Sequence, residues 1–313
     1  MEKKVSIGVD VGGSHISSAA YILDEKRFLP QTLSENKVDN KKPADEIISS
    51  WAKTISETIE KARPHEISGI GFAMPGPFDY YHGIALFEGL NNKFESLYNI
   101  NIAEKISNAL GLGESIPVRF INDAAAFAIG ENNAGSAAGF SRCLAITLGT
   151  GFGASFLHDQ IPVVSGETVP PNGMLYHLPF DNALADDYFS TRGLLERYAN
   201  KTGEQLPGVK DLAAKAPGNT TAQEIFNDFG TKLGMFLKPW IQKFGVEVLV
   251  IGGNISKAFH LFGDSLVNVY ADSGIDLNIK ISELKETASI IGGAALSDDD
   301  YYVRLKPVLL NKT

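Results

Sequence analysis

Two glycine-rich turns, each directly after a short apolar run, are the features of this sequence best suited to hold an anion. The first follows Val5–Val9 and reads Asp10-Val-Gly-Gly-Ser14, and the second follows Cys143–Thr147 and reads Gly149-Thr-Gly-Phe-Gly153. Because glycine has no Cβ, phosphate oxygens can come close to the backbone N–H groups of such turns. Neither turn has the Walker lysine or the G-x-G-x-x-G spacing. We interpret the two turns as binding one phosphate chain from two sides. The alternative is that both are ordinary hairpin turns.

Two aspartates stand where they could take part in chemistry. Asp10, beside the first turn, could hold a divalent cation through water, which suits Mg²⁺; it could equally be a structural aspartate. Asn122 and Asp123 follow the apolar run Val118–Ile121. A carboxylate at such a strand-to-helix junction could remove a proton from a hydroxyl while Asn122 orients the substrate. The alternative is that this pair only caps the helix.

Strands alternating with helices must position these residues. Gly252-Gly253, after the buried run Val248–Ile251, predicts either a surface for adenine or ribose or a tight turn between strand and helix. The strand–turn–strand pattern occurs once in each half, which suggests two related α/β domains. The predicted strands are 5–9, 17–23, 67–73, 118–121, 143–147, 155–158, 246–251 and 277–281. The predicted helices are 43–62, 102–110, 124–131, 191–200, 220–244 and 288–296, with one more after Gly252-Gly253.

Length and composition exclude several classes of protein. The 313 residues suffice for two domains, and 44% hydrophobic with 21% charged residues is typical of a globular protein. The net charge of −9 argues against nucleic-acid binding as the main role. Cys143 is the only cysteine, so the chain can form no internal disulfide and no multi-cysteine zinc site. No apolar run reaches the ~18 residues of a membrane span, so we expect a cytoplasmic protein.

Five motifs in this order resemble those of the ROK family of sugar kinases (repressors, open reading frames and kinases), over about residues 5–296. Besides the two glycine turns they are Pro75-Gly-Pro-Phe-Asp79, Phe120–Ala124 with Gly130-Glu131 downstream, and Val250–Gly253. The resemblance implies an actin-like, hexokinase-like (ribonuclease H-like) fold of two α/β domains with a cleft between them. The expected divisions are residues 1–121, residues 122–296 and a tail, 297–313, that returns to the N-terminal domain.

The resemblance also implies a role for each matched residue. Asp123 would be the general base, and Gly76, Asn122, His177 and Glu196 would hold the sugar. Mg²⁺ would lie near Asp10 and bridge phosphate oxygens. ATP would contact Asp10, Gly12, Gly13, Ser14, Gly149, Thr150, Gly151, Gly252 and Gly253. A homodimer is a further expectation from the family.

One stretch departs from the family pattern. Where the family has G-E-x-G-H, this chain has Gly173-Met-Leu-Tyr-His177, so Met174 replaces a glutamate that contacts a sugar hydroxyl. Glu167 could substitute for it. His177 could instead be a packed histidine that is hydrogen-bonded to Asp186 or Asp187.

The family's three zinc-binding cysteines are also absent, because these positions are Asp187, Phe189 and Leu194. We therefore predict no zinc site. The segment 160–191 should be held by packing of Tyr176, Tyr188, Phe189 and Leu194 instead.

These observations favour an ATP-dependent kinase of a hexose or acylamino-hexose. A catalytically weak or inactive sugar-binding sensor of the same fold is the first alternative, motivated by the altered segment around Met174. A DNA-binding repressor is the second. The repressors of the family have an N-terminal helix-turn-helix domain, for which there is no room here, because the first kinase strand begins at Val5.

Overall fold

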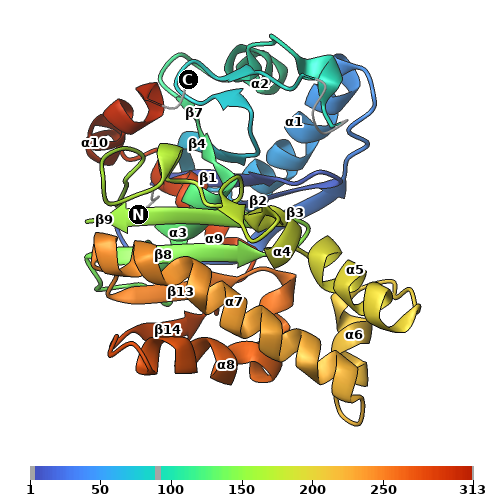
Figure 1. The fold of residues 1–313 in the computed structure, drawn as a ribbon. Helices are drawn as coiled ribbons and strands as arrows, with labels where there is room; N and C mark the ends of the chain where they lie inside the picture. Colours follow the sequence, from blue (N-terminus) through green and yellow to red (C-terminus); the bar gives the residue numbers. More distant parts are fainter. Residues whose placement is uncertain (1–3, 89–92, 312–313) are drawn as a thin grey trace. The chain divides into compact units, whose positions relative to one another are not determined.

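The computed structural model describes residues 4–88 and 93–311, which divide into two units (Figure 1). The first comprises Met1–Ala138, Gln160–Pro162 and Glu286–Thr313, and the second comprises Gly139–Asp159 and Val163–Lys285. This division differs from the predicted boundaries, since residues 122–138 and 286–296 belong to the first unit. The cause is long-range packing between the two helices formed by these segments, which no local pattern reveals.

The first unit is built on a sheet with the strand order β3-β2-β1-β4-β7. β1, β2 and β3 form an antiparallel meander, whereas β1, β4 and β7 run parallel. β3 was not predicted, because its mixed polar sequence has no clear alternation. The strands are β1 (Lys4–Val11), β2 (His15–Ile22), β3 (Arg27–Lys37), β4 (Glu66–Met74) and β7 (Val118–Asn122).

The sequence pattern predicted the helices of the first unit except the C-terminal one, 299–310. α1 buries Ile47, Trp51 and Ile55 at the predicted four-residue spacing. α2 ends at Gly111, whose φ of 61° lies in the left-handed region that favours glycine. The helices are α1 (Ala44–Lys61), α2 (Ile102–Leu110), α3 (Asp123–Ala134), α9 (Thr287–Ala295) and α10 (Asp299–Leu310), with the short elements β5 (Phe78–Asp79), β6 (Ile84–Ala85), η1 (Glu95–Leu97) and β10 (Ile161–Pro162).

Glycines let α9 lie directly against the backbone of its neighbours. A Cβ on Gly71 of β4 would come within 1.9 Å of the carbonyl oxygen of Gly293, and a Cβ on Gly130 of α3 would come equally close to the carbonyl oxygen of Ala288. Neither position tolerates a side chain unless backbone moves. This close packing holds α3, whose first residue is Asp123, within the first unit.

The C-terminal helix α10 also belongs to the first unit. Asp298 caps it by accepting a hydrogen bond from the Tyr301 N–H at 3.0 Å. Arg119 of β7 donates to the carbonyl oxygen of Leu296 at 2.6 Å and lies over the ring of Tyr302, 4.0 Å from its centroid. The described part of the predicted tail is therefore anchored by specific contacts; residues 312 and 313 lie outside the described residues.

The second unit repeats the strand–turn–strand pattern, as predicted. Its strands lie in the order β9-β8-β13-β14, with β8 and β9 antiparallel and β8, β13 and β14 parallel. The helices α4 and α6 were not predicted, whereas a helix was predicted after the Gly252-Gly253 turn, where α8 lies. The elements are β8 (Arg142–Leu148), β9 (Phe152–His158), η2 (Pro171–Gly173), β11 (Pro179–Phe180), β12 (Ala183–Leu184), α4 (Ala185–Phe189), α5 (Thr191–Thr202), α6 (Val209–Lys215), α7 (Thr220–Phe244), β13 (Val248–Gly252), η3 (Asn254–Ala258), α8 (Phe259–Ala271) and β14 (Asn278–Ile281).

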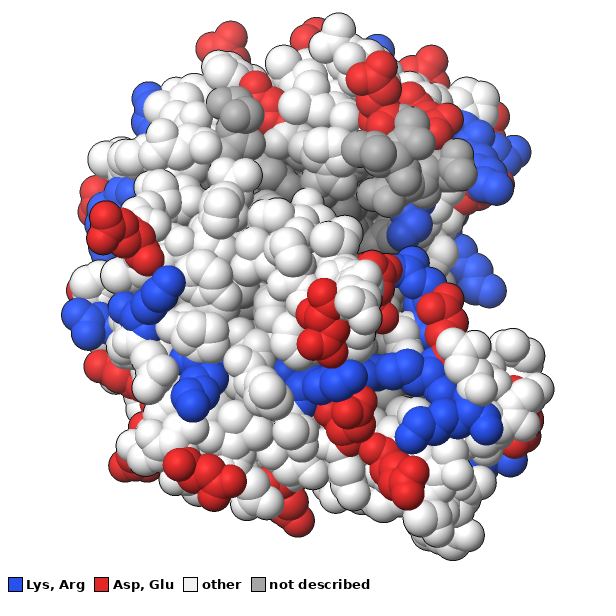
Figure 2. Space-filling model, viewed as in Figure 1, with Lys and Arg blue, Asp and Glu red and all other residues white. Residues whose placement is uncertain are grey.

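Side chains of both charges are interspersed on the face of the molecule shown in Figure 2. Within residues 4–88 and 93–311, none of the helices combines the length and the apolar character that crossing a membrane would require.

Candidate active site

The first glycine turn joins β1 to β2 and has open backbone donors. The N–H of Gly12 donates to the carbonyl oxygen of His15 at 2.9 Å, and a role of Gly12 in phosphate binding stays a prediction. The hairpin itself requires this bond. The N–H groups of Gly13 and Ser14 form no hydrogen bond with any described residue. The open backbone donors of the turn are therefore those of Gly13 and Ser14, and the Ser14 hydroxyl lies 2.8 Å from Nδ1 of His15.

Asp10 lies at the end of β1 in a region of concentrated negative charge. Burial above all, and then the charges of Asp123 and Glu286, raise the pKa of its carboxyl from 3.8 to about 7. The protonated and ionised forms are thus both populated near neutral pH. A divalent cation would relieve this excess of negative charge and favour the ionised form. The residues present therefore fit Mg²⁺.

The way in which Mg²⁺ would be held also follows from the geometry. Among the described residues, no three His, Cys, Asp or Glu side chains are grouped closely enough to hold a metal ion. Mg²⁺ keeps several waters and commonly takes one or two carboxylates together with phosphate oxygens. Asp10 would supply such a carboxylate contact, through water, as the sequence suggested.

Asn122 and Asp123 stand at the junction of β7 and α3. Asn122 caps the helix, since its Oδ1 accepts from the N–H of Ala125 at 3.4 Å, as the structural alternative predicted. Its Nδ2 donates to Oδ1 of Asp123 at 3.0 Å, and that oxygen also accepts from the N–H of Ala124 at 2.8 Å. Asp123 is exposed, whereas Asn122 is buried. Asn122 thus positions the Asp123 carboxylate.

Tyr80 contacts the candidate site residue Asn122, and the sequence did not reveal this contact. Its buried hydroxyl donates to the carbonyl oxygen of Met74 at 3.2 Å and accepts from Nδ2 of Asn122 at 3.2 Å. A Cβ on Gly76 would lie 3.3 Å from the same hydroxyl. Tyr80 therefore links Gly76 to Asn122 and, through Asn122, to Asp123. Its position directly after the Pro75–Asp79 motif was the available signal, but a tyrosine there is more often core.

The second glycine turn, between β8 and β9, is less open than expected. The Gly149 N–H donates to the carbonyl oxygen of Gly151 at 3.1 Å. Oδ1 of Asp186 accepts from the Phe152 N–H at 2.7 Å and lies 3.1 Å from where a Cβ of Gly151 would be. A carboxylate thus stands beside a turn in which we expected phosphate. Thr150 and Gly151 of this turn are exposed.

Gly253 adopts a conformation that glycine alone tolerates well. Its φ is +81°, and a Cβ there would lie 2.4 Å from the carbonyl oxygen of Leu148. Close packing of the turn after β13 against the end of β8 accounts for this glycine. Gly252 is the last residue of β13 and is buried. A role of either residue in nucleotide binding stays a prediction.

The predicted sugar-binding residues of the second unit have few contacts. His177 is half-buried, and its ring packs edge-on against Tyr176 at a centroid distance of 5.1 Å. Among the described residues it forms none of the hydrogen bonds expected with Asp186 or Asp187, because these carboxylates bind the N–H groups of other residues and Arg192. Glu196 of α5 is exposed, as is Glu167, whereas Met174 is half-buried.

Aromatic packing holds the segment before α5, partly as predicted. Phe189 and Leu194 are fully buried, and Phe189 packs on Phe152 at a centroid distance of 5.4 Å. Tyr188 is half-buried. The prediction is wrong for Tyr176, which is 47% exposed. Its only ring contact among the described residues is the one with the adjacent His177.

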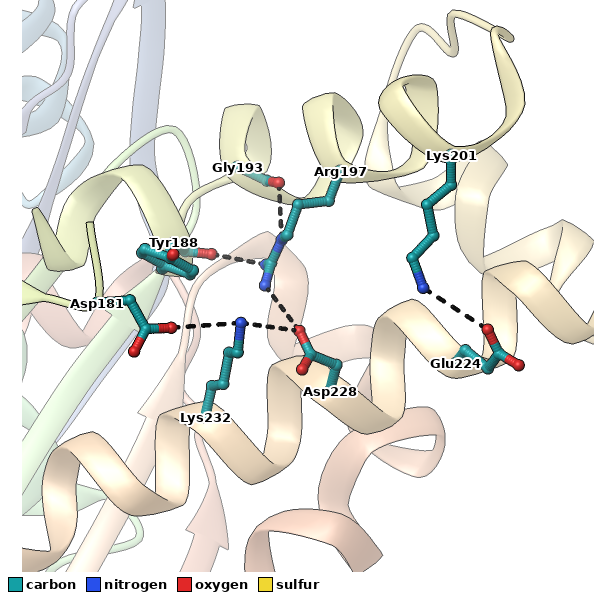
Figure 3. A network of polar contacts seen from close by, with 8 residues as sticks. All are labelled: Asp181, Tyr188, Gly193, Arg197, Lys201, Glu224, Asp228 and Lys232. Carbon is teal, nitrogen blue, oxygen red and sulfur yellow. Dashed lines mark hydrogen bonds and ion pairs between the residues drawn. The ribbon is translucent and has the colours of Figure 1, made fainter. Parts of the chain in front are cut away.

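Arg197 holds this segment through polar contacts that the sequence did not predict (Figure 3). Arg197 of α5 donates to the carbonyl oxygens of Tyr188 at 2.8 Å and of Gly193 at 3.0 Å, and it pairs with Asp228 of α7 at 3.4 Å. Lys232 of α7 lies between Asp228 and Asp181, at 3.5 and 3.4 Å. These contacts tie α4, α5 and α7 together at the place where the family pattern has its cysteines.

Comparison with known proteins identifies the chain. The ROK family model matches residues 6–300. The glucokinase of Thermotoga maritima is 27% identical over 334 residues, which cover 95% of this chain and 98% of that protein. The N-acetyl-D-glucosamine kinase of Haemophilus influenzae is 25% identical, covering 82% of this chain and 86% of that protein.

The solved structures agree on the fold. A ROK family glucokinase from Streptomyces griseus, in complex with glucose and AMPPNP, superposes with a TM-score of 0.72 at 22% identity, over 93% of this chain and 98% of that one. The predicted α/β, actin-like fold is confirmed. Since the family model covers nearly the whole sequence, this chain belongs to the ROK family.

Proposed function

We propose that this protein transfers the terminal phosphoryl group of ATP to a hydroxyl of a hexose or acylamino-hexose, with Asp123 as general base. The observation that carries the proposal is the exposed Asp123 carboxylate, oriented at Oδ1 by Asn122 and the Ala124 N–H. The first unit also contains a glycine turn with open donors and the acidic site at Asp10. Relatives named as kinases of glucose and N-acetylglucosamine support it.

The proposed reaction assigns a task to each part. Asp123 accepts the proton of the sugar hydroxyl as the sugar oxygen bonds to the γ-phosphorus and the bond to the ADP oxygen breaks. The N–H groups of Gly13 and Ser14 hold phosphate oxygens. When bound, Mg²⁺ near Asp10 neutralises charge on the phosphates.

The other assignments are proposals that rest on the matched motifs. Gly76, His177 and Glu196 would contact the sugar, and Tyr80 would position Asn122. Gly149, Thr150 and Gly151 would contact the phosphates, and Gly252 and Gly253 would contact the nucleoside.

A sugar panel tests the proposed function directly. The purified protein is incubated with ATP, Mg²⁺ and one of glucose, fructose, mannose, N-acetylglucosamine or N-acetylmannosamine, and ADP release is measured in a coupled assay. We expect sugar-dependent ADP release with at least one of them. Sugar binding without ADP release, measured by calorimetry, would support the sensor instead.

Glucose should be a poor substrate, because the Met174 side chain cannot accept the hydrogen bond from a sugar hydroxyl that the glutamate of the family accepts. A hydrogen bond to a charged group contributes about 1.5–3 kcal/mol. We therefore expect a KM for glucose well above ~1 mM, the upper end of usual values. Met174→Glu should lower this KM. A sub-millimolar KM for glucose in the unmodified protein would contradict the prediction and make Glu167→Gln the next variant to measure.

The purified protein should contain no stoichiometric zinc. The positions of the family's cysteines are Asp187, Phe189 and Leu194; Asp187 pairs with Arg192 at 2.5 Å, and the other two are buried in the core. Metal analysis by mass spectrometry, after dialysis against metal-free buffer, checks this. One tightly held zinc per chain would show that the prediction is wrong.

A further inference from the structure

We propose that Lys93 binds the phosphate chain at the first glycine turn, an inference that rests on the proposed kinase function. A Cβ on Gly13 would lie 3.1 Å from both Cε and Nζ of Lys93. A side chain at position 13 would therefore crowd the end of the Lys93 side chain. Glycine at this position leaves room for the ammonium as well as for a phosphate.

Donors without acceptors gather at this turn. The N–H groups of Gly13 and Ser14 have no hydrogen-bond partner in the described part of the chain, and neither Asp nor Glu of that part forms an ion pair with Lys93. Lys93 itself is exposed, as is Ser14. A multiply charged group with several acceptor oxygens would satisfy all three donors at once, and a triphosphate has this chemistry. The combination resembles in kind the pairing of lysine with backbone N–H groups in phosphate-binding loops.

The chain next to Lys93 is tied to the turn. Asn40 donates from Nδ2 to the carbonyl oxygen of Gly13, and its own carbonyl oxygen accepts from the N–H of Phe94 at 3.0 Å. Phe94 is buried and packs edge-on against Trp51 of α1, with ring centroids 5.5 Å apart. Asn40 therefore connects the turn to the residue that follows Lys93, and Phe94 anchors that residue in the core. The backbone next to Lys93 is therefore held in place, and the lysine side chain extends from it to Gly13.

The charge arrangement around the turn supports this role. Asp10, at the end of β1, concentrates negative charge and suits a cation, whereas Lys93 brings positive charge to Gly13. A phosphate chain held between a metal ion and a lysine has its charge neutralised from two directions, and phosphoryl transfer depends chiefly on such neutralisation.

Calorimetric titration with ATP and Mg²⁺, and separately with inorganic tripolyphosphate, tests this assignment. Lys93→Met should weaken the binding of both by about 10- to 100-fold, the loss of a charge-assisted hydrogen bond, and should leave adenosine binding unchanged. Lys41→Met is the matched control, because Lys41 is another exposed lysine of the same unit. It should behave like the unmodified protein, and thermal melting should show both variants folded.

A double-mutant cycle makes the test specific to the contact with Gly13. Gly13→Ala adds a Cβ that would crowd the end of the Lys93 side chain, so it should weaken tripolyphosphate binding more in the unmodified protein than in Lys93→Met. If Lys93→Met binds as Lys41→Met does, or if the unmodified protein binds neither ATP nor tripolyphosphate, the assignment is wrong. If the protein binds ATP but phosphorylates no sugar, the kinase proposal fails, while the loss of binding in Lys93→Met still supports the phosphate site.

Discussion

Asp123→Asn is expected to lower kcat for sugar phosphorylation by about 10²- to 10⁴-fold, the usual effect of losing a general base. Sugar affinity should stay within roughly tenfold, or ~1.4 kcal/mol. An asparagine keeps an oxygen that can accept from the Ala124 N–H, but it cannot take a proton from the sugar hydroxyl. The measurement is steady-state kinetics on the best sugar of the panel, with sugar affinity measured by calorimetry.

Asp300→Asn is the matched control for this variant. Asp300 is likewise an exposed aspartate in the first turn of a helix of the first unit, α10. Both variants should lose the modest helix-dipole stabilisation, typically about 0.3–1 kcal/mol, so a loss of kcat confined to Asp123→Asn reports chemistry. Near-normal turnover of Asp123→Asn on the true substrate would mean that Asp123 only caps α3.

Gly71→Ala is expected to destabilise the protein by roughly 3 kcal/mol, at the upper end for overpacking. The added Cβ would lie 1.9 Å from the carbonyl oxygen of Gly293 and 3.2 Å from Cβ of Leu296, so the backbone of α9 would have to move away from β4. Chemical denaturation followed by circular dichroism measures the change in the free energy of unfolding.

Gly113→Ala is the control that separates the steric effect of the added Cβ from the general effect of replacing a glycine. The nearest atom to a Cβ on Gly113 is Oγ of Ser115 at 3.9 Å, and its φ lies outside the left-handed region, so Gly113→Ala should change the stability little. If Gly71→Ala is as stable as Gly113→Ala, then α9 does not lie against β4 as closely as described.

Much of the fold was predictable because its signals are local. The helices Ile102–Leu110 and Thr220–Phe244 have the predicted bounds, since apolar periodicity and a terminal glycine specify each of them within the segment itself. The junction at Asn122 and Asp123 was predictable for the same reason: an apolar strand followed by a capping residue is a pattern of neighbours in sequence. The order of the short motifs then sufficed to indicate the family.

Contacts between distant segments could not be derived in this way. Gly71 lies against Gly293, and Asp186 lies against Gly151, yet nothing near any of these residues in sequence signals its partner. The domain boundary was misplaced because α9 completes the packing around β1, β4 and α3, far from them along the chain.

The candidate site likewise has features that the sequence predicts and features that only the tertiary structure decides. The residue types suited to phosphate and to proton transfer, Asp10 and Asp123 with the glycines, follow from composition and spacing. That Asp186 lies beside the second turn and that the Lys93 side chain lies next to Gly13 depended on the tertiary structure. A side chain acts through what it touches, and here the contacts of Asp186 and Lys93 come from folding together segments tens of residues apart.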